Sequence, residues 1–250
     1  MAAKNKLLTV LFEAEQYALY GLPDFDDAQQ LEYLALSETE LMLATSRPGL
    51  HAQVYCILQI GYFKAKHTFF RFDWSDVEDD CAFVLSRYFI GDAFERKSIT
   101  NHEHYTQRGR IAELFGYRLW TSDFLPQLAR QAESIVRRDV SPGFVVAELL
   151  AWLNDHKIIR PGHTTLQELI SETLSAERRR LGCLLAEILD DATKATLAQL
   201  LVRDDTLSQL AALKQDAKDF GWRQMVRERE KRAMLEPLHK IAKTLLPSQP

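Results

Sequence analysis

The closest pair of histidines in the sequence flanks a glutamate, in the run His102-Glu103-His104. Imidazole and carboxylate groups are common zinc ligands. Successive helical residues are about 100° apart, so two histidines two positions apart point roughly 200° away from each other. They cannot hold one ion together, and the sequence predicts no metal at this cluster. We interpret these residues as surface or capping side chains.

Paired aspartates are the other candidate for chemistry, because a two-metal nuclease needs clustered carboxylates. Such a site requires carboxylates that converge from separate elements on metals about 4 Å apart. All four pairs lie at predicted helix starts or turns, where aspartate is common as a cap. No Gly-rich phosphate loop and no Gly-x-Ser-x-Gly elbow is present. The sequence therefore predicts no catalysis, no cofactor and no small-molecule substrate. The pairs are Asp26-Asp27, Asp79-Asp80, Asp190-Asp191 and Asp204-Asp205.

A predicted helix over residues 100–115 carries side chains suited to DNA. Asparagine and arginine can bond a base edge with two hydrogen bonds, and tyrosine and arginine also bond phosphates. A recognition helix usually reads the major groove with its N-terminal residues. The cations before and after this helix are placed to contact the DNA backbone. The candidate contacts of this region are Arg96, Lys97, Asn101, Tyr105, Arg108, Arg110 and Arg118.

A second basic face is predicted near the C-terminal end of the sequence. Arg223, Arg227 and Lys231 recur at four-residue spacing and share one side of a predicted helix. That face could follow DNA phosphates. Alternatively, Glu228 and Glu230 neutralise it and leave a solvated, salt-bridged helix.

The charge of the chain is acidic overall but unevenly distributed. The 250 residues carry a net charge of −4. Residues 1–100 hold 9 Lys and Arg against 15 Asp and Glu, whereas residues 96–138 hold 8 against 4 and residues 221–243 hold 7 against 3. A local basic face can bind DNA on an acidic protein. Hydrophobic residues make up 46 % of the chain, as in ordinary globular proteins.

Apolar residues recur with helical spacing along most of the chain, and no set of alternating strands is evident. We predict an all-α fold, a multi-helix orthogonal bundle with helix-turn-helix-like elements. Thr100 with Glu103, and Thr165 with Glu168, fit the capping-box pattern of a helix start. Ser141-Pro142 places a capping serine before a proline at the first helical position.

Pro161-Gly162 is the best candidate for a domain boundary. It divides the chain into residues 1–162, the predicted DNA-binding domain, and residues 163–250, a helical extension. No apolar run reaches the eighteen residues of a membrane span, and no signal-peptide cleavage pattern follows Met1. We expect a cytoplasmic, nucleoid-associated bacterial protein. Its three scattered cysteines are expected to pack as small buried hydrophobes in a reducing compartment.

Several short segments are similar, in order and approximate spacing, to motifs near the start of the Tn-three family of transposases. They span roughly residues 9–190. Each motif is short, and the specificity of the resemblance comes from the set together. The matches are LYGLPDF at 19–25 with LYG-P-F, 53–63 with AL-QL-YL, 100–104 with TR-EH, 115–118 with GYR, 158–161 with RII-P and 166–169 with ERL.

The resemblance implies an all-helical domain of unknown-function type at the amino terminus of a replicative transposase. In that family this region recognises the terminal inverted repeats of the transposon. Catalysis belongs to a DDE, RNase-H-like domain much further along the chain. The resemblance therefore implies double-stranded DNA as the partner and no catalytic residue in this sequence. Asn101 stands where the TR-EH motif has a basic residue, and the basic run before AL-QL-YL is reduced to Arg47 and His51.

Two hypotheses of different classes follow. The first is sequence-specific recognition of transposon-end DNA by a helical module. The second is a helical module for protein interaction, through which a transposase or a truncated regulator assembles with itself. The sequence support for this second hypothesis is the abundance of apolar helix surface and the acidic first hundred residues. A stand-alone enzyme has no catalytic constellation to support it.

Overall fold

A computed structural model describes residues 10–191, 194–195, 198, 203–204 and 207–208 of the chain. The chain divides into two compact units, residues 1–177 and 178–250. In the second unit the described residues include the end of helix α9 and two short antiparallel strands, β1 (Arg203–Asp204) and β2 (Leu207–Ser208). The division expected at Pro161-Gly162 stays a prediction.

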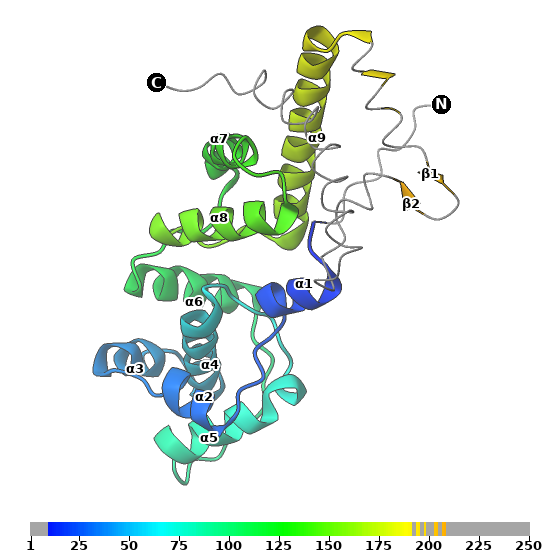
Figure 1. The fold of residues 1–250 in the computed structure, drawn as a ribbon. Helices are drawn as coiled ribbons and strands as arrows, with labels where there is room; N and C mark the ends of the chain where they lie inside the picture. Colours follow the sequence, from blue (N-terminus) through cyan, green and yellow to red (C-terminus); the bar gives the residue numbers. More distant parts are fainter. Residues whose placement is uncertain (1–9, 192–193, 196–197, 199–202, 205–206, 209–250) are drawn as a thin grey trace. The chain divides into compact units, whose positions relative to one another are not determined.

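The named secondary-structure elements in the described part of the first unit are all helices, so the predicted all-α class is confirmed (Figure 1). Two short 3-10 turns, η1 (Trp74–Val77) and η2 (Ser122–Phe124), precede α5 and α7. In the part of the chain that the structure covers, no helix is long and apolar enough to cross a membrane. The α-helices are α1 (Glu13–Tyr20), α2 (Asp27–Tyr33), α3 (Glu38–Thr45), α4 (Leu50–Lys66), α5 (Glu78–Tyr88), α6 (Asn101–Leu114), α7 (Leu125–Val136), α8 (Pro142–Asp155) and α9 (His163–Ile188).

Helix α4 is the centre of the first hydrophobic cluster. Nearly every residue between Ala52 and Phe63 is buried, as expected for a helix that is apolar on all sides. Helices α2, α3, α5 and α6 pack against it. Gly61 allows the end of α2 to come close, because a Cβ there would lie 2.4 Å from Leu34 Cδ2. The chain leaves α4 through His67, which has a left-handed backbone (φ 48°).

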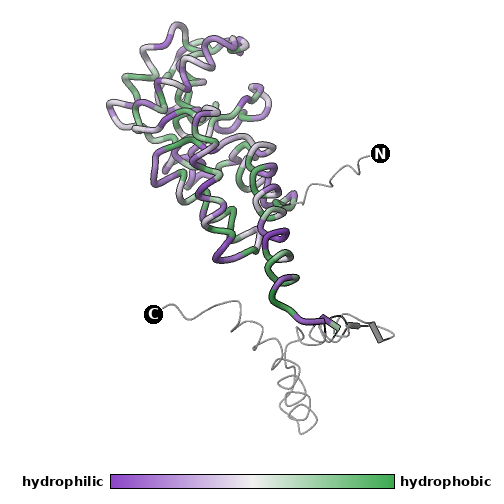
Figure 2. The backbone as a smooth tube through the Cα atoms, turned by 90° about the horizontal axis from the view of Figure 1, so that it is seen from above, coloured by the Kyte–Doolittle hydropathy of each residue, from purple (hydrophilic) through white to green (hydrophobic). Residues whose placement is uncertain are grey.

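A second cluster joins α7, α8 and the start of α9. Leu128, Leu149 and Ile170 are fully buried in it. Val10 and Leu11, which precede α1, also belong to this cluster. Hydrophobic and hydrophilic residues alternate along these helices, as Figure 2 shows, so each buries one side.

The segment around Arg160 connects the two clusters. Arg118 N donates to Lys157 O at 2.7 Å, and Ile159 N donates to Arg118 O at 3.0 Å. The Arg160 guanidinium donates to two backbone oxygens, Leu19 O at 3.1 Å and Lys66 O. Burial lowers the pKa of Arg160 from its ordinary value, and the nearby Tyr20 opposes that shift. Residues 19, 66 and 160 are far apart in sequence and are held together by this one side chain.

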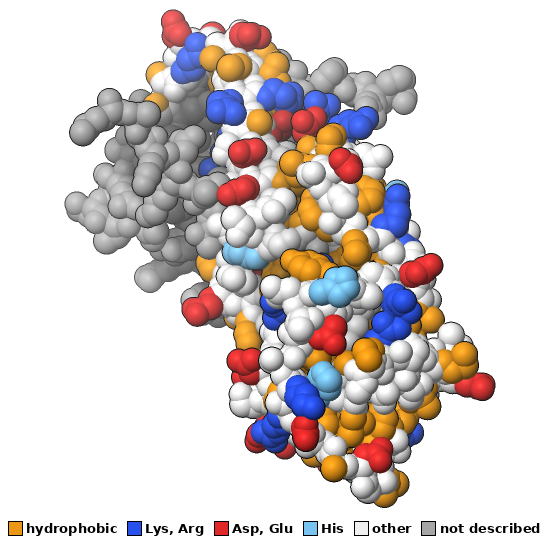
Figure 3. All heavy atoms as spheres, turned by 180° about the vertical axis from the view of Figure 1, so that it is seen from behind, with side chains coloured by type: hydrophobic (Ala, Val, Ile, Leu, Met, Phe, Trp, Pro, Cys, Tyr) orange, Lys and Arg blue, Asp and Glu red, His pale blue; other side chains and the backbone are white. Residues whose placement is uncertain are grey.

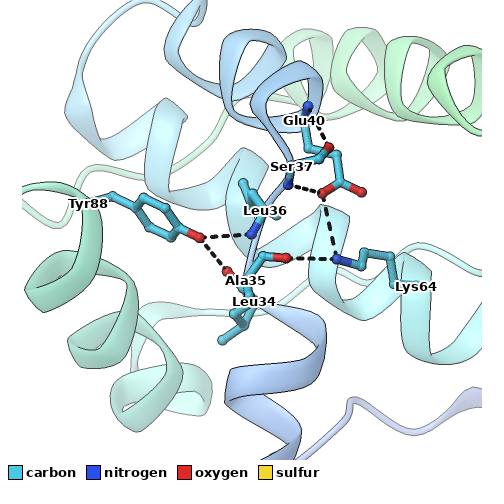
Figure 4. Close-up of polar contacts among 7 residues, drawn as sticks. All are labelled: Leu34, Ala35, Leu36, Ser37, Glu40, Lys64 and Tyr88. Carbon is cyan, nitrogen blue, oxygen red and sulfur yellow. Dashed lines mark hydrogen bonds and ion pairs between the residues drawn. The ribbon is translucent and has the colours of Figure 1, made fainter.

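The connection between α2 and α3 is fixed by side chains from two other helices (Figure 4). The Tyr88 hydroxyl accepts a hydrogen bond from Leu36 N at 2.8 Å and donates to Leu34 O at 2.9 Å. Lys64 Nζ donates to Ala35 O at 3.0 Å and lies 3.6 Å from a carboxylate oxygen of Glu40. The connection has no helical partners for these backbone groups, so the side chains satisfy them.

Some local expectations are wrong. Helix α9 begins at His163, so Thr165 lies inside the helix and does not cap it. Cys56 and Cys81 are buried as expected, but Cys183 is exposed. The cap at Thr100 and the proline start at Pro142 are confirmed, but the Ser141 side chain makes no capping hydrogen bond.

Candidate nucleic-acid interface

Helix α6 is positioned by its cap and by its buried side. Thr100 N donates to Glu103 Oε2 at 3.0 Å, and Glu103 N donates to Thr100 Oγ1 at 3.2 Å. These reciprocal bonds satisfy two backbone donors at the helix start. Ile111 and Ala112 are buried against the first cluster. His104 and Gln107 are also buried, and the opposite side of α6 is exposed, so it can present side chains to a partner.

One edge of α6 carries three of the predicted contacts. Asn101 is exposed in the first turn, and Tyr105 is 61 % exposed. The guanidinium carbon of Arg108 lies 5.7 Å from the centre of the Tyr105 ring and 5.3 Å from that of Phe69. Such cation–π contacts hold a guanidinium while leaving donors free. The positions at 101, 105 and 108 recur at helical spacing, which confirms that they share one side of the helix.

Arg108 is charged and partly desolvated. Burial lowers the pKa of Arg108 from its ordinary value, and Tyr105 acts in the opposite direction. Its Nε is buried and has no hydrogen-bond partner among the described residues. A cation held in this way is a strong partner for an anion, since it has lost much of its water.

Arg71 completes this cluster and was not predicted from the sequence. It is exposed on the extended segment between α4 and η1, and its guanidinium carbon lies 6.0 Å from the centre of the Tyr105 ring. Among the described residues, neither Arg71 nor Arg108 forms an ion pair with a carboxylate. The sequence feature that could have indicated Arg71 is its position within the aromatic run 69–74. We call Arg71, Tyr105 and Arg108 the arginine–tyrosine cluster.

His104 lies beneath this cluster, where the sequence analysis expected a surface or capping residue. It is 5 % exposed, and its Nδ1 is 3.0 Å from the Tyr55 hydroxyl. Burial, followed by the charges of Arg108 and Arg71, lowers its pKa to about 4. The surface prediction is therefore wrong for His104, because position 104 turns toward α4. His102 is exposed, and Glu103 is the cap.

Arg96 and Lys97 differ from the cluster because carboxylates already pair with them. Arg96 Nη1 lies 2.7 Å from Glu78 Oε1, and Lys97 Nζ lies 2.7 Å from Glu95 Oε2. All four side chains are more than half exposed. Exposed pairs of this kind contribute about 0–1 kcal/mol, so a phosphate could replace either carboxylate.

The other predicted cations lie apart from the arginine–tyrosine cluster. Arg110 is exposed on α6, about 200° around the helix from Arg108. Arg118 donates to His156 O at 3.3 Å and lies over the Phe124 ring at 4.9 Å. The second predicted basic face, at Arg223, Arg227 and Lys231, lies outside the described residues.

Gly109 lies in the interior of α6, where the surrounding structure does not require a glycine. A Cβ built at this position meets no atom within 4 Å. Glycine inside a helix costs roughly 0.5–1 kcal/mol relative to alanine. It leaves the backbone of α6 open to the close approach of a partner.

A cleft lies beside α6, between the segment 71–76 and the segment 96–99. It measures about 600 Å³ and is lined by aromatic, basic and acidic side chains. Arg71 of the arginine–tyrosine cluster forms part of its wall.

On the face shown in Figure 3, basic and acidic side chains are interspersed. On this face, a DNA contact would therefore depend on local groups of basic side chains.

Comparison with known proteins gives the family of this helical chain. Residues 10–173, about two thirds of the sequence, match the family described as a domain of unknown function, DUF4158. The chain belongs to the DUF4158 family. The matched residues of this DUF4158 protein include every described candidate contact.

Two curated relatives relate this DUF4158 chain distantly to the amino-terminal portion of Tn-three family transposases. The transposase for transposon Tn21 of Escherichia coli is 23 % identical over 202 residues, which cover 79 % of the chain and 20 % of the relative. The transposase for transposon gamma-delta of Escherichia coli (strain K12) is 28 % identical over 206 residues, which cover 76 % and 19 %. The DUF4158 chain thus spans about a fifth of the length of these relatives.

The family relationship confirms the resemblance read from the short motifs. In the DUF4158 structure, the segment similar to TR-EH contains the cap and first turn of α6. The segments similar to LYG-P-F and RII-P meet at Arg160, which donates to Leu19 O, and at Tyr20, whose hydroxyl donates to Pro161 O at 3.1 Å. These two motifs therefore position the scaffold, whereas the α6 motif exposes Thr100, Asn101 and His102 and buries His104.

Proposed function

We propose that this chain recognises the DNA ends of a transposon and that α6 is its main contact. The arginine–tyrosine cluster carries the proposal. It places two guanidiniums without carboxylate partners around one exposed ring, at the edge of a capped helix. Guanidiniums bind phosphates and guanine edges, and the tyrosine hydroxyl binds phosphate.

Asn101 extends the proposed contact to the start of α6, and Arg110 would contact DNA from the other side of the helix. Asn101 is in the first turn, where recognition helices contact base edges. Gly109 lets a DNA strand approach the middle of the helix. Arg96, Lys97 and Arg118 would hold phosphates on either side, after exchange of the ion pairs at Arg96 and Lys97. The face at Arg223, Arg227 and Lys231 remains a proposed backbone contact.

The finer architecture also belongs to this proposal. Helices α7 and α8 are joined by residues 137–141 and pack together, as in a helix-turn-helix-like pair. We propose that residues 1–162 form the DNA-binding part, that residues 163–250 extend it, and that these residues bind DNA without catalysing strand transfer. The relatives are transposases of two transposons, which supports DNA as the partner.

Fluorescence anisotropy tests the proposal with a duplex that carries the terminal repeat of the chain's own element and a scrambled duplex of equal length. A sequence-specific module should bind the repeat about 10³-fold more tightly or better. The logarithm of the affinity should fall linearly with the logarithm of the salt concentration. Equal binding of both duplexes would exclude sequence-specific recognition. An absence of binding at low salt would exclude DNA binding altogether.

A second candidate function is assembly with another protein chain. Leu31 of α2 is 57 % exposed and Met42 of α3 is 64 % exposed, and both helices pack on α4. These two exposed apolar side chains support this candidate. Sedimentation of the chain with and without DNA separates this candidate from the first, because a DNA-independent oligomer is expected only for assembly.

A further inference from the structure

Aromatic rings line the cleft beside α6. These rings take no part in the proposed duplex contact. Its volume of about 600 Å³ falls within the range of small-molecule sites. Phe72 and Trp74 line it, and Tyr55 and His104 also contribute to its lining. A ligand of this cleft would therefore meet ring faces.

These rings are held in place by contacts of their own. The Trp74 indole nitrogen donates to Lys97 O at 2.9 Å, and the Trp74 ring lies edge-on to Phe94 at 5.2 Å. Phe72 is stacked on Tyr55, with ring centres 4.6 Å apart. The cleft therefore needs little rearrangement before a flat ligand stacks in it.

The charges around the cleft are mixed. Arg71 and Arg96 line it, but so do Asp73 and Asp76. One Asp76 carboxylate oxygen accepts from Asp73 N at 2.9 Å, so this carboxylate is fixed in the wall. A bare phosphate would meet both carboxylates as well as the arginines. A ligand with an aromatic ring, amino or ring N–H donors and a single anionic group matches all of these side chains.

We propose that this cleft binds one unpaired nucleotide of a DNA strand. The base stacks against the aromatic wall that Trp74 and Phe72 form, its N–H donors face Asp73 or Asp76, and its phosphate is bound by Arg71. Bases stack on aromatic side chains in most single-strand binding sites.

Arg71 gives this inference its connection to α6, because it borders the cleft and also contacts Tyr105. A duplex on α6 would therefore have its frayed or extrahelical nucleotide within reach of the cleft. The identification of the ligand as part of a DNA strand rests on the proposed DNA-binding function. The nucleotide site itself can be tested without a duplex.

Two measurements test the cleft in the full chain. In the first, dGMP and inorganic phosphate are titrated while tryptophan fluorescence is followed. We expect dGMP to quench the emission, Trp74→Phe to lose this quenching, and Trp120→Phe, a ring outside the cleft, to keep it. In the second, the affinity for a blunt duplex is compared with that for the same duplex carrying one unpaired terminal nucleotide. We expect the unpaired nucleotide to strengthen binding roughly tenfold.

Variants separate the cleft from the duplex contact. Ser98→Glu adds a negative charge to the exposed rim of the cleft and should abolish the tenfold preference without requiring a change in the core. Arg87→Gln removes an exposed arginine that contacts rings on α5 and should keep the preference. Duplex binding without quenching by dGMP and without the preference overturns the cleft proposal alone. Quenching by dGMP without duplex binding overturns the proposed function alone.

Discussion

Arg108 and Tyr105 are one helical turn apart on α6, and the guanidinium carbon of Arg108 lies 5.7 Å from the centre of the Tyr105 ring. This contact fixes a partly buried cation at the solvent edge of the helix. Arg71 approaches the same ring from a different segment. The interaction of two cations with one ring gives a local positive site on a chain whose net charge is −4.

The first prediction concerns the charge of Arg108. Arg108→Gln should weaken duplex binding roughly 10–100-fold at low salt, because it removes a charge-assisted hydrogen bond to DNA. The slope of log affinity against log salt should also decrease by about one. Arg87→Gln is the control, because Arg87 likewise contacts two rings but is exposed. An unchanged slope in Arg108→Gln would exclude a phosphate contact at this residue.

The second prediction uses Gly109. Gly109→Ala should raise the free energy of unfolding by about 0.5–1 kcal/mol, because alanine favours the helix and an added Cβ meets nothing within 4 Å. The same change should weaken duplex binding about fivefold, a loss of about 1 kcal/mol, if DNA lies against the helix backbone. Urea unfolding and anisotropy measure the two effects. Gly182→Ala in α9 is the control, since it also has open space around it and should affect stability alone.

The third prediction concerns pH and His104. Its folded-state pKa is about 4, lowered by burial and by Arg108 and Arg71, against an ordinary 6.5. Between these values the unfolded chain binds a proton that the folded chain does not. The free energy of unfolding should therefore fall as the pH falls from about 6.5 to about 4.

Urea unfolding at pH 7 and pH 5 measures this dependence. Besides the two arginines, the group that faces His104 is the Tyr55 hydroxyl. His104→Gln keeps a side chain able to bond Tyr55 and should reduce the loss of stability between the two pH values. Equal losses in the variant and the parent would show that His104 is not the group responsible. Asp80, whose pKa is raised by burial, contributes in the opposite direction and is common to both proteins.

The fourth prediction tests Arg160. Arg160→Gln should lower the free energy of unfolding by about 2–4 kcal/mol, because the oxygens of Leu19 and Lys66 lose their charged donor. Chemical unfolding measures the change. Arg130→Gln is the control, since Arg130 is exposed and donates only to Pro126 O in its own helix, and it should change stability by less than about 0.5 kcal/mol. Similar values for both variants would contradict a connecting role for Arg160.

The helices with strong local signals were predictable from the sequence. The cap at Thr100 and the proline at position 142 are confirmed because both act within one turn of helix. Thr165 fits the same capping pattern, yet α9 begins at His163. A capping motif identifies a helix start only when the preceding residues are not themselves helical, which local spacing does not determine.

The candidate site was only partly predictable. Tyr105 and Arg108 follow from the periodicity of one helix. Arg71 could not be found in that way, because its contact with Tyr105 joins residues 34 positions apart through the packing of α6 on α4. The burial of His104 has the same origin. The ion pair at Arg96 likewise depends on the fold, which brings Glu78 near, whereas Lys97 pairs with Glu95 only two positions away.

The Tyr88 hydroxyl, which bonds both Leu34 O and Leu36 N, has a consequence for association. With Lys64, it holds the α2–α3 connection in one conformation, so Leu31 and Met42 are presented from helices that are already ordered. A protein that docked there would lose little conformational entropy from this side of the contact. Preorganisation of this kind permits useful affinity from a small apolar patch.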